Sequence, residues 1–226
     1  MKQNLRIRIC GLAMALLMPL GVAHAALISG LYNTGVDDNN VVLGDGVADS
    51  HYASGWVAIT PDPAGGLPPG GYHGYWLAND SVSRWIGPAA VPTSDNSDTI
   101  RTFTLNFNIA SGFDPATASV SGRYLTDNDG KVSFNGLSLP ALNSSYRDWT
   151  SFSVTSGFHT GLNSLAFDVK NWGAGGENPT GLRVEFGSSS INVAAVPEPE
   201  IYAMMAIGLG MVGFLSRRRE RQRAAA

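Results

Sequence analysis

Apolar and polar residues alternate along most of the chain between Ala26 and Val193. From Phe103 to Ile109 every second residue is apolar and those between are polar, which is the pattern of a β-strand with one buried face. Similar runs predict strands over 54–60, 82–86, 120–124, 132–134, 137–139, 149–154, 165–169 and 182–186. No stretch of this region has a convincing helical period. The pattern therefore predicts an all-β domain of eight or more short strands.

Turn residues between these runs indicate how the strands connect. Asn135-Gly136 lies between apolar residues and is the strongest short signal of a hairpin. Asp129-Gly130 predicts another turn, so residues 124–139 are expected to form a meander, and Asp114-Pro115 predicts a turn before the strand at 120–124. Many short strands joined by Gly, Asn and Asp turns are typical of a β-sandwich or jelly roll.

Several runs of the same region follow one another in a distinctive order. They include Asn135-Gly136, then Gly161 to Val169 and then Asn178 to Glu185, after earlier runs at 46–52, 76–88 and 103–107. In this order, most of the chain from Val41 to Phe186 resembles galactose-binding-like jelly rolls of bacterial surface proteins. The resemblance implies a jelly-roll β-sandwich. Many members of that family bind glycans and others are structural modules, so the resemblance implies a fold more than a function.

The first 25 residues have the composition of a secretory signal peptide. A basic start is followed by an apolar run from Ile9 to Val22 and by Ala23-His24-Ala25, which has the small-x-small shape of a signal-peptidase site. A transmembrane helix is the other interpretation, and the cleavage site argues against it. We predict that signal peptidase cuts after Ala25, so that the exported protein begins at Ala26.

Three signals follow one another at the C-terminus. Val196-Pro197-Glu198-Pro199 is expected to be stiff and extended, because each proline fixes its own φ and disfavours helix in the residue before it. An uncharged apolar segment runs from Ile201 to Leu215 and is shorter than the roughly 20 residues of a full membrane span. A basic end then begins with Arg217, Arg218 and Arg219 and prefers the cytoplasmic face. A plain transmembrane anchor is one interpretation of this order.

The same order of motif, apolar helix and arginine cluster resembles the PEP-CTERM sorting domain of Gram-negative bacteria that make exopolysaccharide. The resemblance covers about 30 residues. It implies that a short transmembrane helix holds the chain in the inner membrane until an exosortase-type membrane peptidase processes the tail and releases the protein outward. The chain is therefore predicted to consist of a signal peptide (1–25), a β-sandwich (26–195) and a sorting tail (196–226).

The composition between the two end segments excludes some functions. The single cysteine, Cys10, lies in the predicted signal peptide, so the domain has no thiol or disulfide chemistry. Eight of the 15 basic residues lie in the end segments, which leaves seven against 15 acidic residues and a net charge of −8. An acidic domain lacks the basic surface that nucleic acids require, and we expect no nucleic-acid partner.

Candidate catalytic groups are few. The histidines of the domain, His51, His73 and His159, form no zinc-binding array, and the sequence has neither a nucleophile elbow nor a phosphate loop. Carboxylates are plentiful, which leaves a hydrolytic pair open, but most of them lie beside Gly, Asn or Ser in turns. We therefore expect a protein without enzymatic activity, with a secreted glycan hydrolase as an alternative.

One turn suggests a metal site. In Asp127-Asn128-Asp129-Gly130, oxygen ligands clustered before a glycine resemble half of a calcium loop, and domains of the resembled type often carry one structural calcium ion. The distal Glu of a full loop is missing, and an ordinary hairpin turn is the other interpretation. Apart from a structural calcium ion at Asp127 and Asp129, we expect no cofactor.

Aromatic residues in loops are the candidates for glycan contact. The Gly- and Pro-rich segment from Pro61 to Gly74 cannot join a central strand, and aromatic residues gather at its end. Such rings suit stacking on the apolar face of a sugar. The candidates are Tyr72, His73, Tyr75, Trp76 and, in a second Gly-rich loop, Trp172. Core packing is the alternative, favoured for Trp85 and Trp149 and equally open for Trp76.

Together these patterns favour an exported, non-enzymatic protein of the cell surface or the extracellular exopolysaccharide matrix. Its expected partners are signal peptidase, the exosortase-type peptidase and exopolysaccharide. A dedicated carbohydrate-binding module is the main alternative, because the loop aromatics would then form a glycan site.

Overall fold

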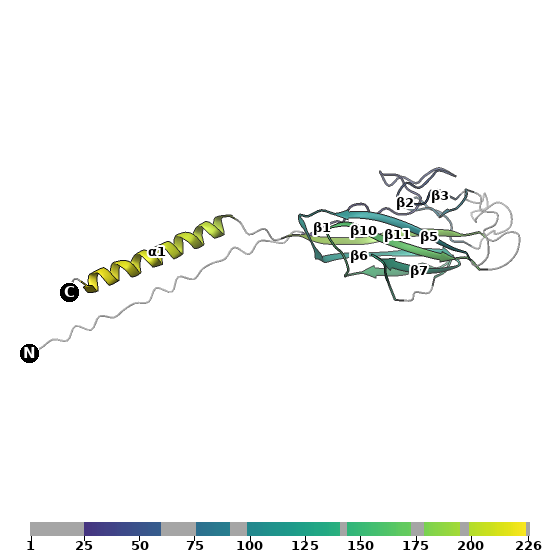
Figure 1. The fold of residues 1–226 in the computed structure, drawn as a ribbon. Helices are drawn as coiled ribbons and strands as arrows, with labels where there is room; N and C mark the ends of the chain where they lie inside the picture. Colours follow the sequence, from purple (N-terminus) through teal and green to yellow (C-terminus); the bar gives the residue numbers. More distant parts are fainter. Residues whose placement is uncertain are drawn as a thin grey trace, which may run out of the picture.

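Two antiparallel sheets packed face to face form a β-sandwich, and a helix follows at the C-terminal end of the chain (Figure 1). The computed structural model describes residues 25–59, 76–90, 99–140, 144–172, 179–194 and 199–224. The predicted all-β sandwich with a C-terminal helix is confirmed, whereas the predicted signal-peptide helix lies outside the described residues except for Ala25.

The strands divide between two sheets. The first sheet has the order β3-β4-β11-β6-β9, with β1 also pairing with β11. Its strands are β1 (Ala25–Ala26), β3 (Val57–Ala58), β4 (Ile86–Gly87), β6 (Phe113–Asp127), β9 (Thr150–Val154) and β11 (Gly181–Val193). The second sheet has the order β2-β5-β10-β7-β8. Its strands are β2 (Tyr52–Ala53), β5 (Ile100–Ile109), β7 (Asp129–Phe134), β8 (Leu137–Ser138) and β10 (Gly161–Lys170).

The main core lies between the sheets and is built by the predicted alternation. On β5 the apolar residues from Phe103 to Ile109 point inward, and on β6 and β11 the inward residues include Tyr124 and Val184. Phe152 of β9 packs against the rings of both Tyr124 and Phe186. Burial of these side chains removes large apolar areas from water, which is the main stabilising term of the fold.

Two predicted turns are wrong. Asp114 and Pro115 lie inside β6 rather than in a turn, because the chain already reverses two residues earlier, where Phe113 N–H donates to Ala110 C=O at 3.2 Å. Pro115 cannot donate to the ladder, and the register of β6 and β11 shifts close to it, between Ser190 and Asn192. The turn at Asp129-Gly130 is likewise absent, since both residues lie in β7.

Residues 124–139 do not form one meander, because β6 belongs to the first sheet and β7 to the second. The chain therefore crosses between the sheets at Asn128. The hairpin from β7 to β8 is confirmed: its turn residues Asn135 and Gly136 have φ of 48° and 80°, the left-handed pair that Asn-Gly adopts most readily.

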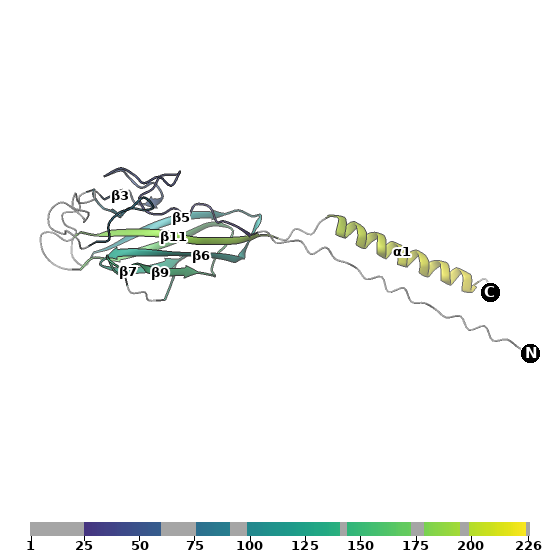
Figure 2. The same cartoon turned by 180° about the vertical axis from the view of Figure 1, so that it is seen from behind.

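Of the strand predicted at 54–60, the described residues form only β3, Val57–Ala58. β2 ends at Ala53, and Ser54 and Gly55 turn the chain with φ of 91° and 74° before β3 begins. The strand predicted at 82–86 is only Ile86–Gly87. These early segments are held by short strand pairs and by backbone hydrogen bonds between loops, such as Ile59 N–H to Trp85 C=O at 2.9 Å. They lie along one side of the sandwich in both views, coloured purple to blue (Figures 1 and 2).

A second apolar cluster lies on the outer face of the first sheet. Leu125 of β6 is fully buried there beneath Ile59, Trp76 and Trp85. Partly buried Tyr146 and Trp149 pack against the same cluster. The segment around 76–90 therefore covers this face, and outward-pointing residues of β6 and β11 are buried beneath it.

The first and last residues of the sandwich domain lie side by side. Ala25 pairs with Asn192 and Ala26 with Ile191, so β1 lies beside the end of β11. Beyond the strand, Ala194 N–H still donates to Gly112 C=O at 2.9 Å. The signal-peptidase cut expected after Ala25 would fall inside β1. It would remove the pair of Ala25 with Asn192 and keep the pair of Ala26 with Ile191. That cut stays a prediction.

Candidate functional site

The described part of the C-terminal tail is one helix, α1 (Pro199–Ala224). Pro199 begins the helix, a position that suits a residue without an N–H and with a helical φ. The prediction that Pro199 belongs to an extended segment is therefore wrong. Val196, Pro197 and Glu198 lie outside the described residues. The helix continues through Arg217, Arg218 and Arg219 and has basic residues in its last turn, where positive charge favours the helix dipole.

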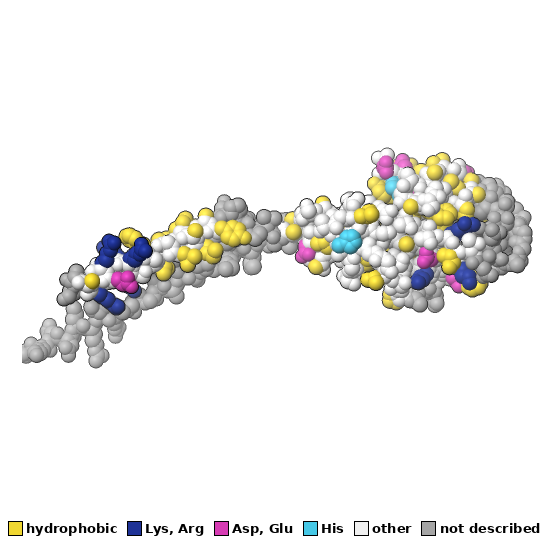
Figure 3. Space-filling model, in the orientation of Figure 1, with side chains coloured by type: hydrophobic (Ala, Val, Ile, Leu, Met, Phe, Trp, Pro, Cys, Tyr) yellow, Lys and Arg dark blue, Asp and Glu magenta, His cyan; other side chains and the backbone are white. Residues whose placement is uncertain are grey.

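Apolar side chains of α1 are exposed on every side of the helix. Leu209, Val212 and Phe214 are each more than 60% exposed, and Figure 3 shows apolar groups on the part nearer the sandwich and basic groups toward the C-terminus. Apolar residues all around a helix require an apolar environment. Across the described residues, no helix is both long enough and apolar enough to cross a membrane, so the predicted transmembrane helix is not confirmed.

Trp76 is buried, so its prediction as a glycan-contact residue is wrong. It is 5% exposed, its ring centroid lies 4.2 Å from that of Trp85, and its Nε1–H donates to Asp127 Oδ2 at 2.9 Å. The ring also packs on Gly181, where a Cβ atom would lie only 2.6 Å from it. Trp76 is therefore part of the second core. Trp85 is buried, as predicted, and Trp149 is partly buried in the same cluster.

Trp172 is the glycan-contact candidate that the structure leaves on the surface. Its side chain is 45% exposed, and Lys170 Nζ lies 3.6 Å from its ring centroid. Its backbone N–H donates to Asn128 Oδ1 at 2.6 Å. The remaining candidates, Tyr72, His73 and Tyr75, lie outside the described residues.

Asp127 and Asp129, the suggested calcium ligands, have different environments. Asp127 is buried and accepts hydrogen bonds from Trp76 and from Asn128 Nδ2 at 2.6 Å, whereas Asp129 is exposed on β7. Burial raises the pKa of Asp127 to about 7, and the Trp76 hydrogen bond works against that rise. Within the described ranges, no group of three or more His, Cys, Asp or Glu side chains is placed to hold a metal ion. The calcium site stays a prediction.

A buried network of charged residues on the outer face of the first sheet was not predicted from the sequence. Arg183 of β11 is fully buried, and its Nε–H donates to Ser83 Oγ at 2.6 Å. Its Nη2 lies 2.7 Å from Asp80 Oδ2 and 3.3 Å from Glu185 Oε1. The available signal was two charged residues, Arg183 and Glu185, alternating with apolar residues inside a single strand.

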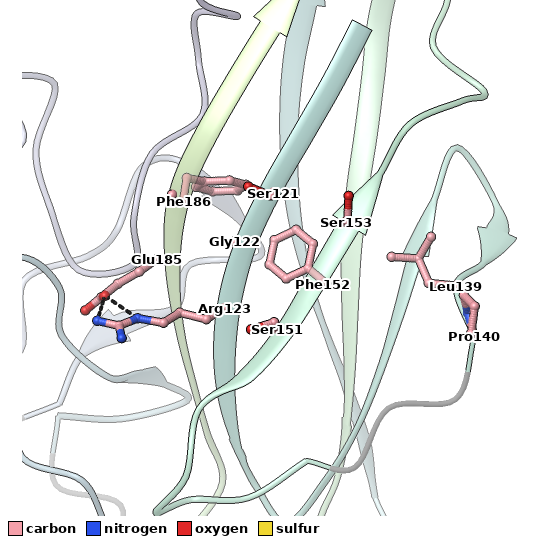
Figure 4. A pocket seen from close by; sticks show the side chains of 11 residues that line it. Ser121, Gly122, Arg123, Leu139, Pro140, Ser151, Phe152, Ser153, Glu185 and Phe186 are labelled. Carbon is pink, nitrogen blue, oxygen red and sulfur yellow. Dashed lines mark hydrogen bonds and ion pairs between the residues drawn. The ribbon is translucent and has the colours of Figure 1, made fainter.

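A cleft of about 690 Å³ lies next to this network, across β6, β9 and β11. Arg123 donates from Nε and Nη2 to Glu185 Oε2 at 2.8 and 2.6 Å, and its guanidinium carbon lies 4.3 Å from the Trp149 ring centroid. Figure 4 shows this pair on one side of the cleft and Leu139 and Pro140 on the other, with Phe152 between them. Candidates chosen from loops alone did not include these strand residues.

A family model matches the tail. Residues 195–219 match the PEP-CTERM protein-sorting motif, so the sorting motif predicted from the C-terminal residues is confirmed. The motif implies processing by an exosortase, which is a membrane protein. It indicates an exported protein of Gram-negative bacteria that is transiently anchored to the membrane.

One similar solved structure is a family 35 carbohydrate binding module from an environmental isolate. It is 13% identical, the alignment covers 66% of this chain and 97% of that chain, and the TM-score is 0.32. A likeness of this size assigns no ligand to the chain. No curated protein has a significant match.

Proposed function

We propose that this chain is an exported, non-enzymatic protein of the cell surface or extracellular matrix, sorted by exosortase through its tail and associated with exopolysaccharide. The observation that carries the proposal is the PEP-CTERM motif at residues 195–219, which coincides with the exposed apolar and basic helix α1. The β-sandwich is then the part that is delivered outside the cell.

The position of the motif supports cleavage between the sandwich and the helix. Ala194 is still hydrogen-bonded to the sandwich and Pro199 begins α1, which leaves residues 195–198 as the connection. Four residues span at most about 14 Å. The peptidase would therefore act close to the folded domain, while the apolar part of α1 is held in the membrane region and the arginines stay on the cytoplasmic side.

Variants of the tail test this proposal. A double substitution of Pro197→Ala and Glu198→Ala should leave full-length protein in the membrane fraction. The matched control is Arg223→Gln, which changes the same helix beyond the matched motif and should leave processing unchanged. Fractionation and immunoblotting in a host with an exosortase give the readout. Equal release of the double variant and of the control would contradict exosortase sorting.

Glycan contact through Trp172 is the second candidate function, because this ring is exposed beside Lys170. A stacked sugar contributes on the order of 1 kcal/mol beyond area burial, by analogy with aromatic pairs, so one contact would bind weakly and a multivalent matrix would be needed for retention. Trp172→Ala should weaken retention on the host's exopolysaccharide with little change in thermal stability. Unchanged retention would exclude this contact.

A further inference from the structure

The cleft across β6, β9 and β11 contains hydrogen-bond donors that the protein does not use. Arginine has five N–H groups, and Arg123 directs two of them to Glu185 Oε2. The Arg123 side chain is 49% exposed. Three N–H groups therefore remain for solvent or for a ligand.

Arg123 is held in one orientation from two sides. Its guanidinium stacks on Trp149, and its partner Glu185 is itself fixed, since Glu185 Oε1 accepts hydrogen bonds from Ser83 Oγ at 2.7 Å and Arg183 Nη2 at 3.3 Å. Both carboxylate oxygens of Glu185 are thus occupied by protein donors. Glu185 acts as a positioning residue for Arg123, and a ligand would meet the free N–H groups of Arg123.

The rest of the cleft combines hydroxyl groups and apolar surface. Ser151 and Ser153 of β9 are exposed along it on the same side of the first sheet as Arg123, and Leu139 and Pro140 line its far end, beyond β9 (Figure 4). A sugar ring presents hydroxyl groups at its rim and C–H groups on its faces, so it suits a site with polar groups on one side and apolar groups on the other. The volume of about 690 Å³ lies in the range of small-ligand sites.

The charges of the cleft favour a neutral ligand. The positive charge of Arg123 is balanced by the adjacent Glu185, and Arg183 is balanced by Asp80. A carboxylate bound to Arg123 would lie close to Glu185 in a domain whose net charge is −8, whereas hydroxyl groups avoid that repulsion.

We propose that this cleft binds a neutral saccharide chain, with Arg123 donating hydrogen bonds to hydroxyl oxygens of one unit and Leu139 and Pro140 contacting the apolar side of another. The site lies at the β9 edge of the first sheet, and Trp172 is not among its lining residues. The proposal rests on the proposed exopolysaccharide association and names a specific site for it.

Titration of the released protein with neutral oligosaccharides tests the cleft. Calorimetry with cellohexaose, mannohexaose and galactohexaose should show binding to at least one of them with a Kd on the order of 1 mM. Polygalacturonate serves as the acidic polymer and should bind more weakly. Arg123→Gln should weaken binding at least about tenfold, because it replaces the guanidinium donors with one shorter amide group. Ser153→Tyr should have a similar effect by filling the cleft while leaving the ion pair intact.

The matched control is Arg147→Gln. Arg147 also lies over an aromatic ring, with its guanidinium carbon 5.5 Å from the centroid of Tyr146, but it is not among the residues that line the cleft. It should bind like the unaltered protein, and unfolding curves should show that all variants fold. Lack of binding to every neutral probe, tighter binding of polygalacturonate, or full binding by both Arg123→Gln and Ser153→Tyr would overturn the proposal. If Trp172→Ala alone then reduces retention on exopolysaccharide, the cleft is excluded and the proposed function stands.

Discussion

The outer faces of the two sheets differ in how far their side chains are exposed to solvent. On the second sheet, Thr104, Asn106 and Asn108 of β5 remain partly or fully exposed to solvent. On the first sheet, Leu125, Arg183 and Glu185 occupy equivalent outward positions and are buried under the segment around 76–90. One face is therefore a polar surface, and the other is, where the segment around 76–90 covers it, a second interior that contains charged groups.

This difference shows what burial demands of a charged residue. A charge removed from water is tolerated only when it is paired and hydrogen-bonded. Arg183 meets this condition through Ser83, Asp80 and Glu185. The outer face of the second sheet is the open face, where a charged residue stays in water and needs no partner. Substitutions of charged residues should therefore be costly on the covered outer face of the first sheet and mild on the open face.

The largest effect is expected where a buried charge loses its partner. Arg183→Met leaves Asp80 without its cation and Glu185 with Arg123 alone, which should lower the free energy of unfolding by about 3–5 kcal/mol. Lys131→Met, an exposed cation of β7 on the second sheet, should change it by about 0.5 kcal/mol or less. Urea unfolding followed by fluorescence measures both. A loss below about 1 kcal/mol for Arg183→Met would show that the network is not stabilising.

Removal of the Trp76 ring should cost slightly less. Trp76→Ala empties a buried site and leaves Asp127 without its indole donor, and large-to-small changes of buried aromatic residues cost about 3 kcal/mol or more. Trp172→Ala at an exposed site should cost about 1 kcal/mol or less, mainly the Lys170 contact. Thermal unfolding of both variants checks the contrast. Equal shifts in Tm would mean that Trp76 is not a core residue.

The covered face should also make stability depend on pH. The pKa of Asp127 is about 7 in the fold against 3.8 ordinarily, so the folded state binds the proton more tightly than the unfolded state. Its contribution to stability is complete below pH 4 and is lost as the pH rises through about 7, by about 1–3 kcal/mol. Burial also raises the pKa of Asp49, whereas the pKa values of Asp37 and Asp80 are lowered.

A variant isolates this contribution from the other carboxylates. Asp127→Asn keeps an oxygen acceptor for Trp76 and cannot ionise, so its stability should fall less than that of the unaltered protein between pH 5 and pH 8. Urea unfolding at the two pH values gives the comparison. Parallel profiles for the two proteins would argue against a raised pKa of Asp127 in the fold.

The smallest effect is expected on the open face. Asn106→Thr places a β-branched residue at an exposed position of β5, where it suits the strand, and should change the free energy of unfolding by no more than about 0.5 kcal/mol. The same urea experiment applies. A loss of 2 kcal/mol would indicate that this face is covered by another part of the protein.

The open face explains why much of the sandwich could be predicted. Where one side of a strand faces water, as in β5, polar and apolar residues alternate and the strand follows from the sequence. The same local logic identified the Asn135-Gly136 hairpin and the order of signals in the tail. Each of these features depends on residues that are neighbours in the chain.

The covered face explains what could not be predicted. Trp76 follows a Gly- and Pro-rich segment, and contacts with residues far along the chain, such as its hydrogen bond to Asp127 51 residues away, make it a core residue. Residues 82–85 are likewise held by distant contacts, such as the hydrogen bond from Ser83 to Glu185 across 102 residues and that from Arg84 N–H to Thr34 C=O across 50. The cleft at Arg123 also combines three strands and the segment after β8, which no local pattern brings together.

The intact mass of the protein released from a host that has an exosortase tests the central claim most directly. Export and sorting together predict a chain that begins at Ala26 and ends close to Val196–Pro199, without the apolar helix and its arginines. A released protein that retains Ile201–Ala226 would contradict exosortase sorting, and one that retains residues 1–25 would contradict the signal peptide.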